Sequence, residues 1–248
     1  MNTIYILWLR QIKRFLRSGI RIVMGFVQPL IYMLALGYGL NAVFQQSGKG
    51  SYIQFIVPGI IVQTIMFTSM FWGANIIWDK QFGFLKEMLV APVSRTKIMF
   101  GSVLGGATIS LVQGIILFII SLLLGFHPVN WAYLPLTVLF MGMLALAVIG
   151  FSAGIGAVVN DMQAFVAVNN FLLIPLFFLS SALFPLDSVP TAMKIIASFN
   201  PISYAVDAIR FTLINQSHFG LPMDFAVLTV TVILLMTFGS YRFRQIQA

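Results

Sequence analysis

The sequence predicts an all-α integral membrane protein with six transmembrane helices, and three observations support this fold class. Hydrophobic residues make up 60% of the chain and charged residues only 8%, whereas soluble domains carry about 25% charged residues. Long uncharged runs alternate with short polar segments, as expected for membrane spans. The basic residues gather at one set of run ends, which is typical of cytoplasmic flanks. We expect residues 1–248 to form a single transmembrane domain.

Residues 2–21 predict a basic amphipathic helix that precedes the first span. At helical spacing, one face carries Ile4, Leu7, Trp8, Gln11 and Phe15, and another carries Arg10, Lys13, Arg14 and Arg17. Because these charges lie inside the helix, it is neither a cleavable signal nor a span. We expect it in the cytoplasmic interface, with the aromatic face in lipid and the basic face toward phosphates. The alternative is that the basic residues only fix topology.

Six runs are long and apolar enough to be spans, because about 20 residues cross the hydrocarbon. They lie at 22–44, 55–78, within 98–126, within 131–160, at 162–184 and at 225–241. Six spans put both termini on one side of the membrane. Eleven of the 14 Lys and Arg residues then fall on that side, and three, Lys49, Lys194 and Arg210, fall on the other. This split predicts cytoplasmic termini, with 45–51 and 127–130 outside.

Residues 185–222, between the last two spans, are apolar but interrupted by prolines. Asn200 followed by Pro201 predicts an N-cap and first helical position, and so a short helix over 201–214. In that helix Asp207 and Arg210 lie three residues apart and can pair. Ser188 is a candidate cap for a preceding helix over 189–198. We expect this pair of helices to be re-entrant in the outer leaflet; the alternative is an extracellular cap without a role in transport.

The sequence contains no arrangement of residues typical of an enzyme. The SGKG run at 47–50 lacks the upstream glycine and the terminal hydroxyl residue of a phosphate-binding loop, so this chain is not an ATPase. The chain has no cysteine, and its two histidines are not at zinc-binding spacing. The net charge of +8 is explained by membrane flanks, so we expect no nucleic-acid partner.

The predicted spans carry no Asp, Glu, Lys or Arg, although proton- and sodium-coupled transporters need such groups near the midplane. Energy is therefore expected to enter through a partner. The candidate pathway residues are Gln28, Gln63, Gln113, Asn169 and Asn170. The alternative for them is helix-to-helix hydrogen bonding, and the two asparagines point about 100° apart. Phe, Met, Leu and Tyr would line the rest of the pathway, which suits a lipophilic cargo.

The stretch 78–95, WDKQFGFLKEMLVAPVSR, is the only long charged interruption in the middle of the chain. Phe82, Leu85 and Leu89 recur at helical spacing, and Pro92 ends any helix at about residue 91. The run FGFLKEMLVAPVSR closely resembles the loop after the second membrane helix in permease subunits of ABC-2 type exporters. The most similar group is the daunorubicin-resistance-type permeases. A second match comprises FLSSALFPL at 177–185, Pro190, and NPISYAVDAIR at 200–210, which includes Tyr204.

The resemblance implies an assembly and a set of roles. Two copies of the chain would form the pathway at their interface, and two separate ATPase chains would bind ATP and Mg²⁺, so this chain itself binds no cofactor. The 78–95 stretch would hold a coupling helix that docks on the ATPase and acts together with a second cytoplasmic turn. The residues implied are Phe84, Leu85, Glu87, Met88, Leu89, Pro92, Arg95, Asn160 and Asp161. The alternative is that this loop only keeps the protein soluble.

The function implied is export across the cytoplasmic membrane of a prokaryote. A hydrophobic drug or lipid-like molecule would leave the cytoplasm or the inner leaflet, and the re-entrant helices would close the outer end of the pathway. A lipid-linked oligosaccharide is the alternative cargo within the family. A membrane scaffold without transport activity is the alternative from a different class.

Overall fold

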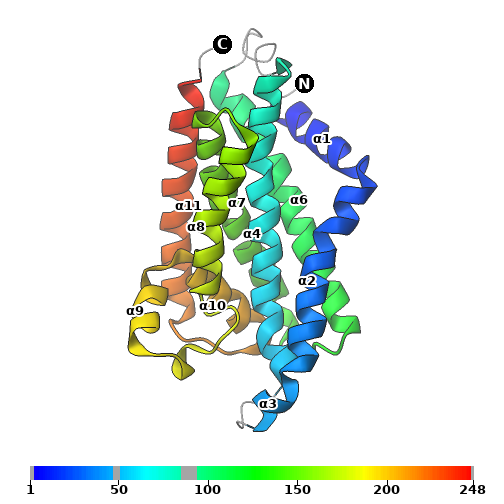
Figure 1. Cartoon of the computed structure of the whole chain (residues 1–248), viewed down its shortest axis with the longest axis vertical. Helices are drawn as coiled ribbons and strands as arrows, with labels where there is room; N and C mark the ends of the chain where they lie inside the picture. Colours follow the sequence, from blue (N-terminus) through cyan, green and yellow to red (C-terminus); the bar gives the residue numbers. More distant parts are fainter. Residues whose placement is uncertain (1–2, 47–50, 85–93, 247–248) are drawn as a thin grey trace.

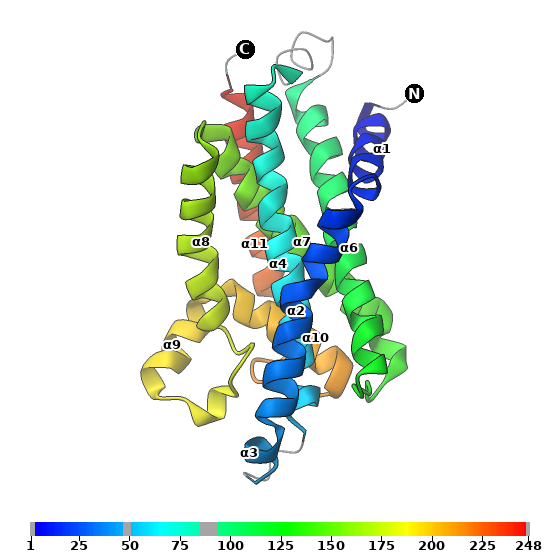
Figure 2. The same ribbon diagram turned by 45° about the vertical axis from the view of Figure 1, so that its right-hand side comes forward.

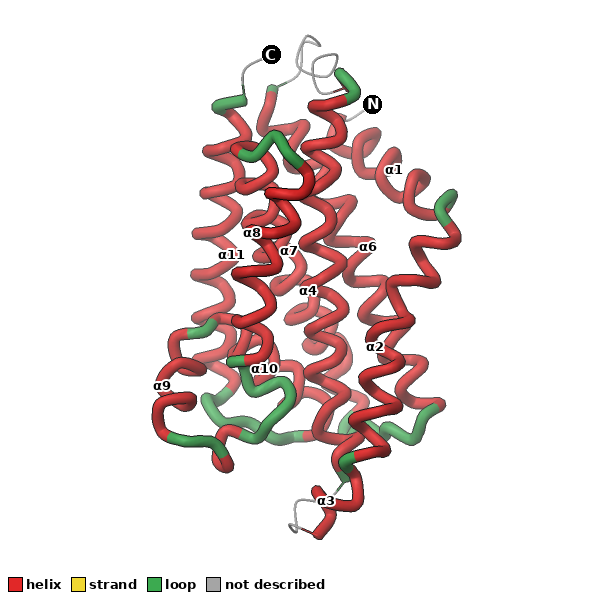
Figure 3. The backbone as a smooth tube through the Cα atoms, viewed as in Figure 1, coloured by secondary structure: helices red, strands yellow, loops and turns green. Residues whose placement is uncertain are grey.

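The computed structural model describes residues 3–46, 51–84 and 94–246, and all regular secondary structure in these ranges is helical (Figure 3). The helices are α1 (Thr3–Leu16), α2 (Gly19–Gly39), α3 (Asn41–Gln46), α4 (Tyr52–Gln81), α6 (Arg95–Leu123), η1 (Trp131–Tyr133), α7 (Leu134–Val158), α8 (Met162–Phe178), η2 (Leu186–Ser188), α9 (Thr191–Phe199), α10 (Pro201–Ile214) and α11 (Leu221–Arg244).

The long helices run side by side (Figure 1). Both termini and helix α1 lie at the end where α4 finishes and α6 begins, which we call the terminal end. The short helices α3, α9 and α10 lie at the opposite end, which we call the far end (Figure 2). The termini therefore share a side with the end of α4 and the start of α6.

Five helices are long and apolar enough to cross a membrane among the described residues: α2, α4, α6, α7 together with η1, and α11. The expected fifth span, 162–184, is shorter than predicted, because α8 is a helix only as far as Phe178. The other spans fall where the uncharged runs predict them. The first differs in one respect, because α2 ends at Gly39 and residues 41–46 form the separate helix α3.

Contacts to α4 and α10 explain why α8 ends early. Arg210 of α10 donates from Nη2 to the Ser181 carbonyl oxygen at 2.7 Å, and the Tyr52 hydroxyl of α4 donates to the Leu183 carbonyl oxygen at 3.0 Å. Gly59 of α4 lies so close to the Ala182 backbone that a side chain there would overlap it. Residues after Phe178 therefore leave the helix and pack their backbone on α4.

Helix α1 forms as predicted, but the prediction that its aromatic face lies in lipid is wrong. Leu7, Gln11 and Phe15 are buried, and the Trp8 indole nitrogen donates to the Thr108 hydroxyl of α6 at 3.0 Å. A Cβ at Gly101 of α6 would lie 2.8 Å from the Leu7 Cβ. Since glycines let two helices approach closely, α6 offers α1 a groove that buries this face. The large hydrophobic residues of α1 that stay exposed are Tyr5, Ile6 and Leu16.

The prediction for α10 is confirmed at both ends. The Asn200 side chain accepts a hydrogen bond from the Ile202 backbone N–H at 3.0 Å, and Pro201 opens the helix. Asn215 ends it in the left-handed conformation, with φ of 57°. Nearly all of α10 is buried against the ends of α4, α7 and α11.

Two finer predictions for this segment are wrong. Helix α9 begins at Thr191 with Pro190 at the N-cap position, because Ser188 belongs to the preceding turn η2. Asp207 and Arg210 do not form an ion pair with each other. Asp207 instead accepts from the Ser217 hydroxyl and from the backbone N–H groups of His218 and Phe219. A carboxylate that already accepts several hydrogen bonds needs no further partner, so Asp207 is stable without an ion pair to Arg210.

Helix α4 is the centre of the bundle, with 83% of its most apolar stretch buried. It contacts α2, α6, α7 and α10, and its Gly73 lies directly on Ser152 of α7. On the other side of α7, Gly150 faces Gly239 of α11. By contrast, only 17% of the apolar stretch of α2 and 11% of that of α11 are buried, so these two helices present apolar side chains outward.

We predict that Gly239→Ala destabilises the protein, because the new Cβ would overlap the Gly150 carbonyl oxygen and lie 3.0 Å from the Met99 methyl group. Overpacking of this kind costs about 1–3 kcal/mol. Thermal unfolding in detergent, followed by size-exclusion chromatography, measures the effect. Gly142→Ala is the matched control, since a Cβ there meets nothing within 4 Å. Equal melting temperatures for the two variants would contradict this packing.

Candidate functional site

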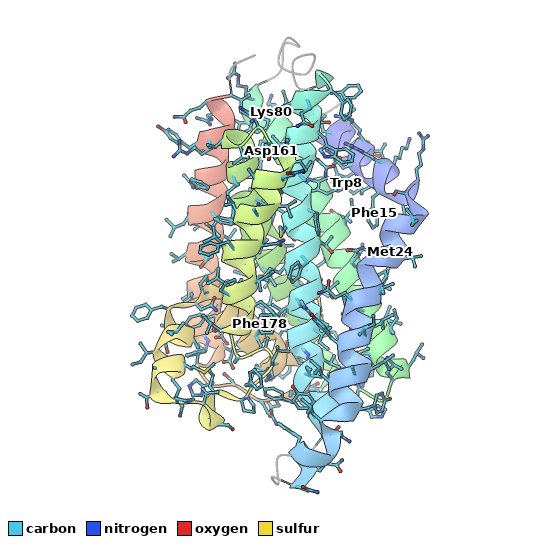
Figure 4. The ribbon with its side chains drawn as sticks, viewed as in Figure 1. Trp8, Phe15, Met24, Lys80, Asp161 and Phe178 are labelled. Atoms are coloured by element: carbon cyan, nitrogen blue, oxygen red, sulfur yellow. The ribbon has the colours of Figure 1, made fainter. Side chains whose placement is uncertain are left out.

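A cavity of about 520 Å³ opens between α1, α2, α4, α6 and α8 in the structure. This volume lies within the range of about 300–1,000 Å³ found for small-molecule sites. Phe15 and Met24, on either side of the junction between α1 and α2, line it (Figure 4). Its aromatic lining comprises Phe15, Phe67, Phe71, Trp72 and Trp78. Its polar lining comprises Gln28, Gln63, Thr64, Thr68, Asn75 and Gln113.

Helix α4 forms the longest wall of this cavity. Gln63, Phe67, Phe71 and Asn75 line it at successive intervals of four residues, followed by Trp78. Residues four apart lie on neighbouring turns of a helix, so amide, aromatic, aromatic, amide and indole groups follow one another along the wall. The cavity therefore combines a large apolar surface with a few neutral hydrogen-bonding groups.

Some polar groups of the cavity hydrogen-bond within the protein. The Thr68 hydroxyl donates to the Gln113 side-chain oxygen, and the Thr64 hydroxyl donates to the Ile60 carbonyl oxygen at 2.9 Å. The Gln113 side-chain nitrogen lies against Gly25, where a Cβ would come within 2.7 Å of it. The glycine in α2 therefore makes room for the amide that reaches over from α6.

Other polar groups of the cavity lack a protein partner or have only a distant one. Gln63 is only 3% exposed, and its Oε1 atom accepts no hydrogen bond. The Gln28 side-chain nitrogen reaches the Tyr32 hydroxyl only at 3.5 Å. Buried polar groups are hydrogen-bonded in the great majority of cases. An unpaired amide oxygen at the wall of a cavity is therefore a candidate contact for a ligand.

Three of the five predicted pathway residues, Gln28, Gln63 and Gln113, line this one cavity although they come from three different helices. The two asparagines of α8 are not part of its lining. Asn169 is buried and donates to the Phe165 carbonyl oxygen of its own helix at 2.9 Å, so it does not hydrogen-bond between helices. Asn170 is partly buried.

The structure contains cavity residues that sequence reasoning did not select, among them Thr64, Thr68 and the aromatic residues on α4. Phe67 and Phe71 follow Gln63 at successive intervals of four residues, and this helical spacing was the available signal. Asn75 was visible as a polar residue in the second span. Phe15 was selected only as part of a lipid-facing surface.

At the terminal end, the predicted coupling residues are described only in part. Leu85, Glu87, Met88, Leu89 and Pro92 lie outside the described residues. Phe84 is half exposed. Arg95 donates from Nη1 to the carbonyl oxygens of Arg244 and Ile246 at 2.7 and 2.6 Å. A cation at the carboxyl end of a helix complements its dipole, so Arg95 joins the start of α6 to the end of α11.

The predicted turn at Asn160–Asp161 connects α7 to α8 and is tied to the end of α4. Lys80 Nζ donates to the Ala157 carbonyl oxygen at 2.6 Å and to the Asn160 side chain at 3.3 Å, and Gln81 donates to the Asn160 carbonyl oxygen at 3.2 Å. Asp161 caps α8 by accepting from the Ala164 N–H at 2.7 Å. Lys80 and Asp161 both lie at this end of the bundle (Figure 4).

Asp79, the neighbour of Lys80, contacts α1 instead of α7. Its carboxylate lies 3.6 Å from the Arg10 guanidinium and 3.7 Å from that of Arg14, both on α1. The Arg14 guanidinium also lies 6.0 Å from the ring centre of Trp78. Sequence reasoning had placed Asp79 after the second span, but α4 extends to Gln81 and buries it.

The far end holds a second group of buried charges. The Arg210 guanidinium lies 4.0 Å from the ring centre of Phe55. Burial lowers the pKa of Arg210 to about 10, so it stays charged at neutral pH. Asp224 is fully buried near Asp207, and its oxygens accept no hydrogen bond from a donor present in the structure. It was missed because the hydropathy pattern placed the start of the last span at residue 225, whereas α11 begins at Leu221.

Comparison with known proteins identifies the family. The model of the ABC-2 type transporter family matches residues 2–214. The chain is 30% identical over 224 residues to a protein of Cyanophora paradoxa named transport permease ycf38, which covers 88% of this chain and 76% of that protein. It is 28% identical over 235 residues to the inner membrane transport permease YadH of Escherichia coli strain K12, covering 92% and 89%. It is 24% identical over 230 residues to nodulation protein J of Rhizobium leguminosarum bv. viciae, covering 92% and 88%.

The family match agrees with the resemblance found in FGFLKEMLVAPVSR and with the long apolar helices. It also agrees with relatives that are named transport permeases. The chain therefore belongs to the ABC-2 type transporter family, in which it is a multi-pass membrane permease.

Proposed function

We propose that this chain is the permease subunit of an ATP-driven exporter for a hydrophobic or amphipathic, drug-like or lipid-like substrate. The observation that carries this proposal is the cavity of about 520 Å³, whose wall on α4 combines aromatic and neutral polar side chains. ATP and Mg²⁺ bind on a separate ATPase subunit, with which permeases of this family associate. The same α4 that lines the cavity ends at the segment predicted to contact that subunit.

The terminal end faces the cytoplasm in this proposal. The described basic residues at that end are Arg10, Lys13, Arg14, Arg17, Lys80, Arg95, Lys97, Arg242 and Arg244. At the far end they are Lys194 and Arg210. An excess of Lys and Arg marks cytoplasmic flanks. Helix α8 would supply the fifth of six crossings, since its 17 residues reach about 26 Å and lie at the lower limit for a span. The name of the relative YadH supports an inner membrane of a prokaryote.

Cysteine labelling tests this orientation, and the absence of native cysteine gives it a clean background. We predict that a membrane-impermeant maleimide labels Thr191→Cys in intact cells, because exposed Thr191 lies at the far end. Gln245→Cys, exposed at the terminal end, should react only after the membrane is opened. The reverse labelling pattern would contradict the orientation.

The contacts of α4 offer a route for coupling. A force on the 78–95 stretch reaches α4 directly, the turn between α7 and α8 through Lys80, and α1 through Asp79. The same force would reach the end of α11 through the hydrogen bond that Arg95 donates to Arg244. Closure of the ATPases would therefore move several helices around the cavity together. The Asn160–Asp161 turn is the second element on which the ATPase would act.

We predict that Leu85→Ala combined with Met88→Ala weakens binding of the ATPase, because these residues would form the apolar face of the coupling helix. Truncating a central anchor of an interface costs about 2 kcal/mol or more, roughly thirtyfold in affinity. Glu87→Ala should leave the complex assembled but uncoupled. Transport and ATP hydrolysis in reconstituted vesicles measure both effects. Wild-type transport by both variants would show that this stretch is not the coupling element.

Two copies of the chain would complete the pathway. Helices α2 and α8 border the cavity and present exposed apolar side chains, among them Met24 and Phe171. Facing copies would cover these surfaces and join their cavities into one route. At the far end α9 and α10 would be re-entrant and close it, and α10 is buried deeply enough to act as a fixed floor.

We predict that Ala74→Trp reduces transport at least tenfold without unfolding the protein, because Ala74 lines the cavity and an indole there would occupy substrate volume. Val230→Trp is the control, since Val230 is 55% exposed on α11 and its replacement adds the same group outside the cavity. Uptake of a fluorescent lipophilic dye into inside-out vesicles with the ATPase present measures transport. Equal activity of the two variants would remove the cavity from the pathway.

A further inference from the structure

The geometry points to the chemical class of the substrate: an elongated amphipathic molecule that carries no anionic group where it lies in the cavity and has hydroxyl or amide groups on both sides of an apolar or aromatic middle. This inference rests on the proposed function, because it assigns the ligand of the same cavity. It goes further by excluding anionic head groups and by naming Gln63 and Asn75 as the two contacts.

The first step is the unpaired amide of Gln63. The residue is 3% exposed, its Oε1 accepts no hydrogen bond, and it lies in the cavity wall. A buried acceptor left without a donor costs about 1–3 kcal/mol. A ligand donor would recover this free energy. A hydroxyl group both donates and accepts, so it suits either orientation of the amide.

The second step is the position of Asn75 on the same helix. Asn75 lines the cavity, and its side chain makes no hydrogen bond in the structure. Twelve residues separate it from Gln63, which corresponds to about 18 Å along α4. Phe67 and Phe71 lie between the two amides. A ligand that satisfies both amides is therefore long, and its middle packs on aromatic rings.

The third step concerns charge. Among the described residues, none that line the cavity is charged. Arg14 is close to Trp78 at the edge of the cavity, but it is paired with Asp79. An anionic group that enters a site without a counter-ion loses its hydration without compensation. Phosphate groups are therefore poor occupants compared with hydroxyl groups.

Two biphenyl probes of equal length test the inference, one with terminal hydroxyl groups and one with terminal phosphate groups. Their binding to the full-length protein in nanodiscs is followed by tryptophan fluorescence, since Trp72 and Trp78 line the cavity. We expect the hydroxyl probe to bind at least tenfold more tightly than the phosphate probe. Gln63→Leu and Asn75→Leu should each weaken binding of the hydroxyl probe roughly fivefold to tenfold while leaving binding of the phosphate probe unchanged. Gln245→Leu, an exposed amide at the terminal end, is the matched control.

Tighter binding of the phosphate probe would overturn the inference, as would wild-type binding of the hydroxyl probe by both leucine variants. Two variants at separate sites guard against one that fails to fold, and a retained size-exclusion profile checks each. Transport is measured separately with the ATPase in vesicles. Hydroxyl selectivity in binding without ATP-driven transport of any probe would leave the substrate class supported and overturn the proposed function. Preferred transport of the phosphate probe would do the opposite.

Discussion

The close backbone packing of α4 is the constraint on which the rest of the structure depends. Gly59 and Gly73 bring this helix into direct contact with the Ala182 backbone and with Ser152 of α7. Apolar burial does not drive helix association within a bilayer, so close packing and interhelical hydrogen bonds must hold the bundle together. The Ser152 hydroxyl donates to the Met70 carbonyl oxygen, and the Ser69 hydroxyl bonds to the Ser110 hydroxyl at 2.9 Å. These contacts supply both the close packing and the hydrogen bonds between helices.

Polar contacts at the end of α4 turn this central helix into a junction. Asp79 binds α1, and Lys80 binds the end of α7. The ion pairs at 3.6 and 3.7 Å involve arginines with side chains about one-third exposed, and exposed pairs contribute only about 0–1 kcal/mol. These ion pairs therefore orient α1 but contribute little to its stability. Close packing of α1 against the glycines of α6 holds it in place.

Sequence reasoning succeeded where the signal is local. Uncharged runs located the helices, Asn200–Pro201 located α10, and polar residues in apolar runs located Gln28, Gln63 and Gln113. It failed where a residue far away in the sequence determines the local structure. The face of α1 is apolar enough for lipid, and Gly101 and Gly105 opposite it explain its burial. Likewise, α8 ends because Arg210 binds Ser181, a contact across 29 residues for which residues 179–184 carry no signal.

Asp207 and Arg210 at the far end make more hydrogen bonds than Gln63 and Gln28 around the cavity, and this difference bears on how the protein moves. At the far end, Asp207 accepts from two backbone N–H groups and a hydroxyl, and Arg210 donates to a backbone carbonyl. Charge-assisted bonds of this kind are strong and fix geometry. Around the cavity, Gln63 has an unpaired oxygen and Gln28 a long contact. Few bonds need to break for the helices there to separate, whereas the far end must move as a unit. A force applied to α4 at the terminal end would therefore separate helices most easily around the cavity.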